Sequence, residues 1–88
     1  MVSVKPIDST TFEVMVEKDT TTMHKVTVTA PYYEKLTAKR VTPEVLVEQS
    51  FKFLLDRESN TSILHSFDLP VIGQYFPEYE RVIKEMLD

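Results

Sequence analysis

The side chains of this chain best suited to chemistry are its two histidines and a nearby aspartate. Asp68 follows His65 by three residues, a spacing that places both on one face of a helix. Such a pair can bind a small ligand or act in catalysis when one pocket holds both groups and the histidine pKa is displaced. A metal site needs three or four converging ligands, and neither H-x-x-x-H nor H-E-x-x-H occurs. We therefore interpret His24 and His65 as structural or solvated, and keep the His65–Asp68 pair as an alternative ligand-binding or catalytic site.

Other common catalytic arrangements are missing from the sequence. The chain has no cysteine, which removes thiolate nucleophiles, disulfides and cysteine-ligated metals. Gly73 is the single glycine, so there is no glycine-rich phosphate loop, and no G-x-S-x-G elbow is present. Helix starts and solvated helix faces explain the glutamates that might otherwise pair as acid and base, which are Glu44, Glu48, Glu78 and Glu80. The sequence thus predicts a protein that is not an enzyme and that has no cofactor or metal.

A basic and aromatic cluster follows the first third of the chain, at Tyr32, Tyr33, Lys35, Lys39 and Arg40. Aromatic side chains among basic ones can stack on bases and hold phosphates, so a nucleic-acid-associated regulator of the antitoxin kind is an alternative function. The net charge of −4 argues against it, and residues 41–88 carry four basic against nine acidic side chains. We expect Leu36 and one of the tyrosines to pack under the sheet while the charged groups reach outward.

The stretch FDLPVIGQYFPEYE at 67–80 gathers four aromatics and two prolines around Gly73. On one interpretation it is an elbow between two helices, because a residue before proline leaves the helical region and large side chains anchor the bend. On the other, Tyr75, Phe76 and Tyr79 stay exposed together and form a partner surface. The second interpretation gives our leading hypothesis, a non-enzymatic protein-interaction or regulatory module.

The elements that must position these residues begin with strands. TFEVMVE (11–17) and MHKVTVTA (23–30) alternate apolar and polar residues with period two, and a shorter strand is expected near residues 2–7. One face carries the valines and Phe12, with His24 at its rim, and the other face is polar. These segments predict a two- or three-stranded antiparallel meander over residues 2–30.

Helices are expected over residues 31–87, because proline is favoured at the first helical position. Thr42 and Asp68 are good N-cap types. A helical turn is expected at 60–67, and helical segments follow four of the five prolines, at 31–36, 43–58, 70–75 and 77–87. The sequence therefore predicts one α+β domain over residues 1–88, with three or four helices packed on one face of the sheet.

The run SILHSFDLPVIGQYFPEYE (62–80), which follows a threonine-rich strand region and a T-P-E-x-L helix start, resembles a group of short uncharacterised bacterial proteins. The resemblance implies a small bacterial protein and brings no activity or site residues. No apolar run approaches the roughly 20 residues of a membrane span, and no signal peptide is evident at the start. We expect a cytoplasmic location and a protein partner, with homodimerisation as a further possibility.

Overall fold

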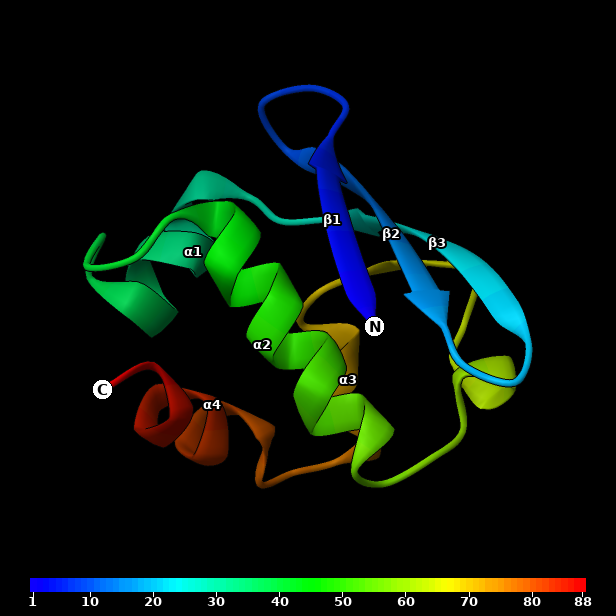
Figure 1. The fold of residues 1–88 in the computed structure, drawn as a ribbon. Helices are drawn as coiled ribbons and strands as arrows, with labels where there is room; N and C mark the ends of the chain where they lie inside the picture. Colours follow the sequence, from blue (N-terminus) through cyan, green and yellow to red (C-terminus); the bar gives the residue numbers. More distant parts are fainter.

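A single mixed sheet of four strands, in the order β1-β2-β3-β4, runs through the computed structural model, which describes all residues 1–88 (Figure 1). The bounds of its strands are β1 (Val2–Pro6), β2 (Thr11–Glu17), β3 (Thr21–Thr27) and β4 (Ser66–Asp68). The first three strands pair antiparallel in chain order, whereas β4 pairs parallel with β3. The α+β class and the antiparallel meander are confirmed, and the expected total of two or three strands is wrong by the added parallel strand.

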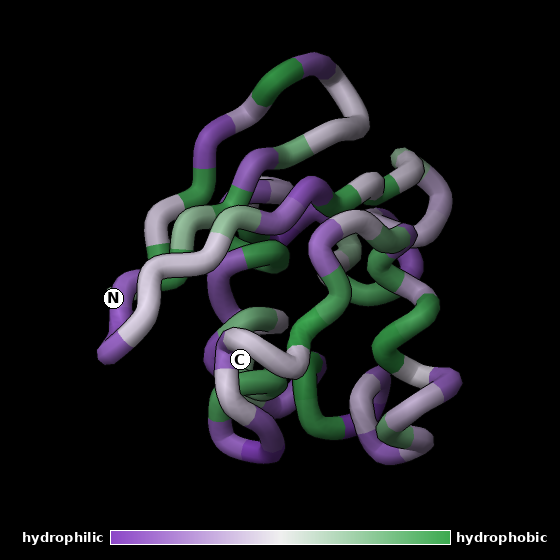
Figure 2. The backbone as a smooth tube through the Cα atoms, turned by 90° about the vertical axis from the view of Figure 1, so that its right-hand side faces the viewer, coloured by the Kyte–Doolittle hydropathy of each residue, from purple (hydrophilic) through white to green (hydrophobic).

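Alternation along the strands sorts their side chains between two faces of the sheet, and Figure 2 shows this alternation along the backbone. Val4, Val14 and His24 lie side by side in register on the inner face, and the next inner row contains Phe12 and Val26. His24 is fully buried, so its expected position at the rim is wrong. The other face carries charged residues, threonines and methionines, and these residues are not part of the hydrophobic core.

Four α-helices and one short 3-10 helix cover the inner face. Their bounds are α1 (Ala30–Thr37), α2 (Pro43–Leu55), η1 (Asn60–Ser62), α3 (Val71–Tyr75) and α4 (Tyr79–Leu87). The predicted N-cap of the second helix is confirmed, because the Thr42 hydroxyl accepts a hydrogen bond from the Val45 N–H at 3.3 Å. α2 contacts β1 on one side and α1 and α4 on another, which closes the core between sheet and helices. None of these helices combines the length and the apolar composition of a membrane span.

The structure departs furthest from the sequence prediction over residues 60–68, where a helical turn was expected along 60–67. After η1 the chain extends and returns to the sheet as β4, where Phe67 lies opposite Val26. We expected all strands to precede all helices in the chain, and this order is wrong because β4 follows α2. Asp68 is the last residue of β4, and Pro70 stands at the start of α3, so the predicted N-cap role of Asp68 is wrong too.

A buried chain of hydrogen bonds fixes this return to the sheet. The His24 Nδ1–H donates to the Leu64 carbonyl at 2.7 Å, and the Thr22 hydroxyl lies 2.9 Å from Nε2. The Asn60 amide donates to the Thr22 hydroxyl at 3.1 Å and to the Thr20 carbonyl at 2.6 Å. Because Nδ1 faces a carbonyl, it carries the proton of a neutral ring, and Nε2 accepts. These bonds tie β3 to residues 60–64 and so set where β4 begins.

Candidate functional site

An apolar groove opens at the end of α2, and the segment 67–80 provides much of its wall. The groove encloses about 260 Å³, including the part open to solvent. Its residues come from the end of α2, the chain before and within β4, and α3 with the residue that follows it. They are Leu54, Glu58, Ile63, Leu64, Phe67, Val71, Ile72, Tyr75 and Phe76. Eight of the nine are hydrophobic, so the groove is suited to an apolar side chain.

The rim and the floor of the groove differ in exposure. Ile72 and Ile63 are buried in the floor, while Tyr75 is 65% exposed and Leu64 is 46% exposed at the rim. A second hollow lined by Ser62, Leu64, Tyr75 and Phe76 continues the groove beside Glu58. Large apolar side chains that remain this exposed beside a hollow are typical of a docking surface.

Glu58 is the one charged residue in the groove wall. It lies beyond the C-terminal end of α2, where the helix dipole disfavours a carboxylate, and it takes part in none of the chain's five ion pairs. Partial burial raises the pKa of its carboxyl. Glu58 is therefore an acidic group in the groove wall without an ion-pair partner.

The three residues of the predicted partner surface, Tyr75, Phe76 and Tyr79, do not lie together on the surface. Tyr75 and Phe76 line the groove. Tyr79 is wholly buried, so the expected exposure of all three together is wrong. Its ring meets Phe53 edge-on at 5.2 Å between centroids, and its hydroxyl lies 2.7 Å from the Ser50 hydroxyl. Tyr79 is thus a core residue that anchors the start of α4.

Local sequence explains the shape of the 67–80 segment. Pro70 precedes α3, and Gly73 lies in its middle with open space where a side chain would be. Phe76 adopts an extended conformation (φ −129°, ψ 91°) just before Pro77, as expected for a residue that precedes proline. The predicted elbow is therefore present at Phe76. Its ring packs edge-on against Phe53 at 5.9 Å, which holds the bend against α2.

The predicted anion patch of Tyr32, Lys35, Lys39 and Arg40 is neutralised by carboxylates. Lys35 Nζ lies 3.2 Å from Glu80, Lys39 Nζ lies 3.6 Å from Glu34, and Arg40 lies 3.1 Å from Asp88. The Tyr32 hydroxyl donates a hydrogen bond to the same Glu80 carboxylate at 2.9 Å. Each positive charge thus has a negative neighbour, and the cluster carries no net charge that would attract a phosphate backbone.

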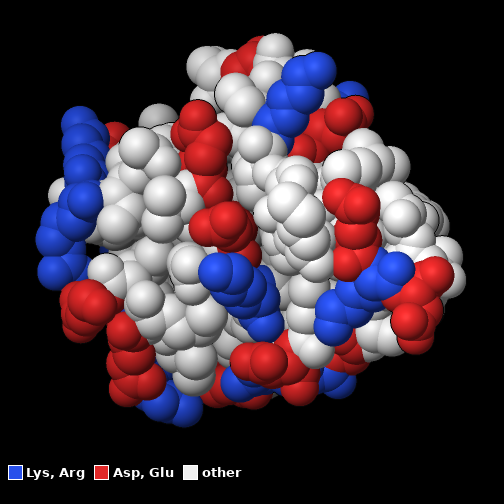
Figure 3. All heavy atoms as spheres, viewed as in Figure 1, with Lys and Arg blue, Asp and Glu red and all other residues white.

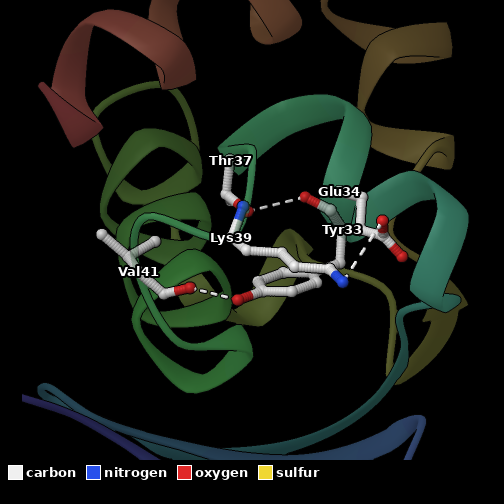
Figure 4. Close-up of polar contacts among 5 residues, drawn as sticks. All are labelled: Tyr33, Glu34, Thr37, Lys39 and Val41. Carbon is white, nitrogen blue, oxygen red and sulfur yellow. Dashed lines mark hydrogen bonds and ion pairs between the residues drawn. The ribbon is translucent and has the colours of Figure 1, made fainter.

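Figure 4 shows that the loop after α1 is held by its own polar contacts. The Tyr33 hydroxyl donates to the Val41 carbonyl. The Thr37 hydroxyl donates to the Tyr33 carbonyl at 2.8 Å and accepts from the Lys39 N–H at 3.0 Å. Lys39 is one of two residues that follow α1 with positive φ, at 62°, and its side chain folds back to Glu34. Lys39 therefore pairs within the end of its own helix, whereas Lys35 and Arg40 pair with Glu80 and Asp88 at the C-terminal end of the chain.

The pair His65 and Asp68 does not form a site. His65 immediately precedes β4 and Asp68 is its last residue. Because side chains alternate along a strand and the two residues are three positions apart, their side chains point to opposite faces of the sheet. The expected shared helix face is absent, since Asp68 lies in a strand and His65 lies in the bend that precedes it. The His65 ring stacks on His24 at 5.7 Å, and its Nδ1 lies 3.3 Å from the Met23 carbonyl. No group of three or more potential metal ligands is found in the chain.

The residues of the groove that sequence reasoning missed are Leu54, Glu58, Ile63, Leu64 and Val71. Glu58 has the sequence pattern of a solvated residue near a helix end, and its neighbours in the groove are distant in the chain. No protein-family model matches this chain, and no curated protein or solved structure gives a significant match. The candidate site therefore rests on geometry.

Proposed function

We propose that this protein is a protein-interaction module that docks a short segment of another protein in the groove at the end of α2. The observation that carries the proposal is the groove itself, eight of whose nine residues are hydrophobic, with Tyr75 and Leu64 exposed at its rim. Exposed apolar surface around a hollow costs solubility and contributes little to folding, so a partner that covers it is the simplest reason for it.

The size of the groove favours a peptide side chain over a small molecule as its occupant. The cavity within the groove measures only about 30 Å³, far below the roughly 300–1,000 Å³ common for small-molecule sites. A groove this shallow suits the tip of one apolar side chain lying across it and not an enclosed ligand. A single aromatic or aliphatic anchor in a hollow is also the usual centre of a protein–protein contact.

Glu58 defines the expected neighbour of that anchor. An unpaired carboxylate on an otherwise apolar wall favours a segment with lysine or arginine beside the anchoring side chain. The expected ligand is thus a short apolar and basic segment. The role needs no catalysis, and the neutralised cluster at Lys35, Lys39 and Arg40 gives nucleic acid no comparable support.

The test begins with a displayed library of random 12-residue peptides, selected on the folded chain. Selected peptides are then measured by fluorescence anisotropy against the wild type and three variants. Tyr75→Ser removes a rim aromatic, and Glu58→Gln removes the charge. Met23→Ser is the matched control, because Met23 is 44% exposed yet lies on the outer sheet face and not in the groove.

The expected result is enrichment of peptides with an aromatic or aliphatic residue next to lysine or arginine. Tyr75→Ser should raise the Kd by roughly fivefold to thirtyfold, the effect of removing a rim anchor worth about 1–2 kcal/mol. Glu58→Gln should raise it less, and not at all for a peptide whose lysine is changed to glutamine. Met23→Ser should leave it unchanged. Absence of any enriched peptide, or equal binding by Tyr75→Ser, would overturn the proposal, and self-association of the chain in sedimentation would replace the partner with a second copy.

A further inference from the structure

The outer edge of β1 has backbone groups without a strand partner. β1 is the first strand in the sheet order and pairs with β2 alone. Met1 and Glu17 exchange both backbone hydrogen bonds, at 2.7 and 2.8 Å, and so form a hydrogen-bonded pair of the antiparallel ladder. Such pairs alternate with pairs whose N–H and C=O groups point away. The N–H and C=O groups of Val2 and Val4 therefore face outward from the sheet.

The far end of the strand supports this assignment. The Ile7 N–H donates to the Thr11 carbonyl at 2.9 Å, so residues 1 and 7 belong to the same alternating set of bonded pairs. Pro6 then belongs to the outward set and offers a carbonyl without an N–H. The edge thus has two complete donor–acceptor pairs and one further acceptor, which suits an added strand of about four or five residues.

Beside this edge lies an acidic hollow formed with the first part of α2. It is lined by Val4, Glu44, Val45 and Glu48 and encloses about 420 Å³, including the part open to solvent. Glu44 and Glu48 are one helical turn apart, both are half-buried, and neither belongs to any of the five ion pairs. Figure 3 views this side of the molecule and shows acidic side chains gathered over the N-terminal half of α2.

We propose that the β1 edge binds an extended segment of another protein whose lysine or arginine side chains reach Glu44 and Glu48. Main-chain bonds to Val2 and Val4 would supply the affinity, as in other cases of strand addition, and the two carboxylates would select the sequence. Because strand side chains alternate, the basic residues occupy every second position, on the side of the hollow. The intervening residues lie beside Ser3 and Lys5 and should be polar and uncharged.

Charge also argues against a second copy as the occupant. Pairing of two β1 edges about a twofold axis would bring both copies of Glu44 and Glu48 to the same junction. Four carboxylates would then repel across the new strand pair. Charged groups beside an exposed edge are a recognised protection against self-pairing, and here they leave the edge open to a basic strand. This site shares no residue with the groove at the end of α2.

The test is a titration of the isotope-labelled chain followed by amide NMR. The probe is the capped peptide acetyl-Lys-Thr-Lys-Thr-Lys-Thr-amide, and its charge-reversed control replaces every lysine with glutamate. Glu44→Gln/Glu48→Gln removes the acidic pair, and Asp56→Asn is its matched control, since Asp56 is an exposed carboxylate at the end of the same helix without an ion pair. Val2→Pro removes an outward N–H and leaves the β1–β2 ladder intact.

The expected result is saturable shifts at the Val2 and Val4 amides with the lysine peptide and none with the glutamate peptide. The double glutamine variant should raise the Kd about threefold to tenfold, as for two partly exposed ion pairs, and added salt should act in the same direction. Asp56→Asn should bind as the wild type, and Val2→Pro should abolish the response while circular dichroism stays unchanged. Shifts confined to other strands, an equal response to both peptides, no response at either valine, or undiminished binding by Val2→Pro would each overturn the proposal.

Discussion

Two tyrosines four residues apart, Tyr75 and Tyr79, offer the sharpest test of how the 67–80 segment is built. Tyr79 is 0% exposed, packs on Phe53 and shares a hydrogen bond with Ser50. Tyr75 is 65% exposed and contacts the groove rim. Replacing each with serine should therefore have opposite consequences for stability and for binding.

The magnitudes follow from burial. Truncating a fully buried aromatic costs about 3–5 kcal/mol, whereas a domain of this size has a free energy of unfolding of roughly 4–13 kcal/mol. Tyr79→Ser should thus remove a large share of the stability. Tyr75→Ser should change the free energy of unfolding by no more than about 0.5 kcal/mol, as for most surface changes.

Tyr79→Phe separates the ring from the hydroxyl. The Ser50 hydroxyl donates to the Leu46 carbonyl at 2.7 Å, so the bond to Tyr79 must be donated by the tyrosine. The phenylalanine variant keeps the ring contact and leaves Ser50 with one bond fewer. It should cost about 1 kcal/mol.

Urea unfolding followed by circular dichroism at 222 nm measures all three variants, with the denaturant slope as a check on two-state behaviour. The reasoning would be refuted if Tyr75→Ser cost more than about 1.5 kcal/mol, or if Tyr79→Ser cost less than Tyr79→Phe. Either result would mean that the two rings do not divide between surface and core as described.

Two further predictions concern the rest of the fold. Burial lowers the pKa of His24 below its unfolded value of 6.5, although the hydrogen bond to Leu64 acts in the opposite direction. The unfolded chain therefore binds a proton more readily than the folded chain. The urea midpoint should fall as the pH drops below about 6.5. His24→Gln should flatten that pH dependence, and an unchanged slope would contradict it. Ala38 ends α1 with φ 51°, a left-handed conformation that glycine adopts freely, so Ala38→Gly should raise the free energy of unfolding by about 0.5–1 kcal/mol. Ala30→Gly, at the ordinary first turn of the same helix, should lower it in the same urea assay, and a gain in both variants would disprove the argument from φ.

Much of the fold follows from local patterns, because the relevant interactions lie within a few residues. Alternation over 11–17 predicts β2 with its correct inner face. Thr42 and Pro43 mark the start of α2 through a cap bond made three residues away. The stripe that includes Val82, Ile83 and Met86 predicts the face that α4 buries against the core.

The fourth strand could not be predicted in this way. β4 has three residues, too few for a period-two pattern, and its partners on β3 lie about 40 residues earlier. Its position depends on the buried bonds from His24 and Asn60, which join separate parts of the chain. The same limit applies to Glu58, whose place in the groove depends on how α2 ends relative to α3.

The 67–80 segment is both an elbow and, in our proposal, a docking surface, and the first property produces the second. In one continuous helix Tyr75 and Tyr79 would share a face, because residues four apart are neighbours on a helix. The extended conformation of Phe76 before Pro77 breaks that relation. α3 therefore leaves Tyr75 at the groove rim, while α4 begins with Tyr79 turned into the core. A substitution that restores helix across the bend would have to bury Tyr75 or expose Tyr79, so the pre-proline break is what allows this small chain to keep an apolar groove open without losing its core.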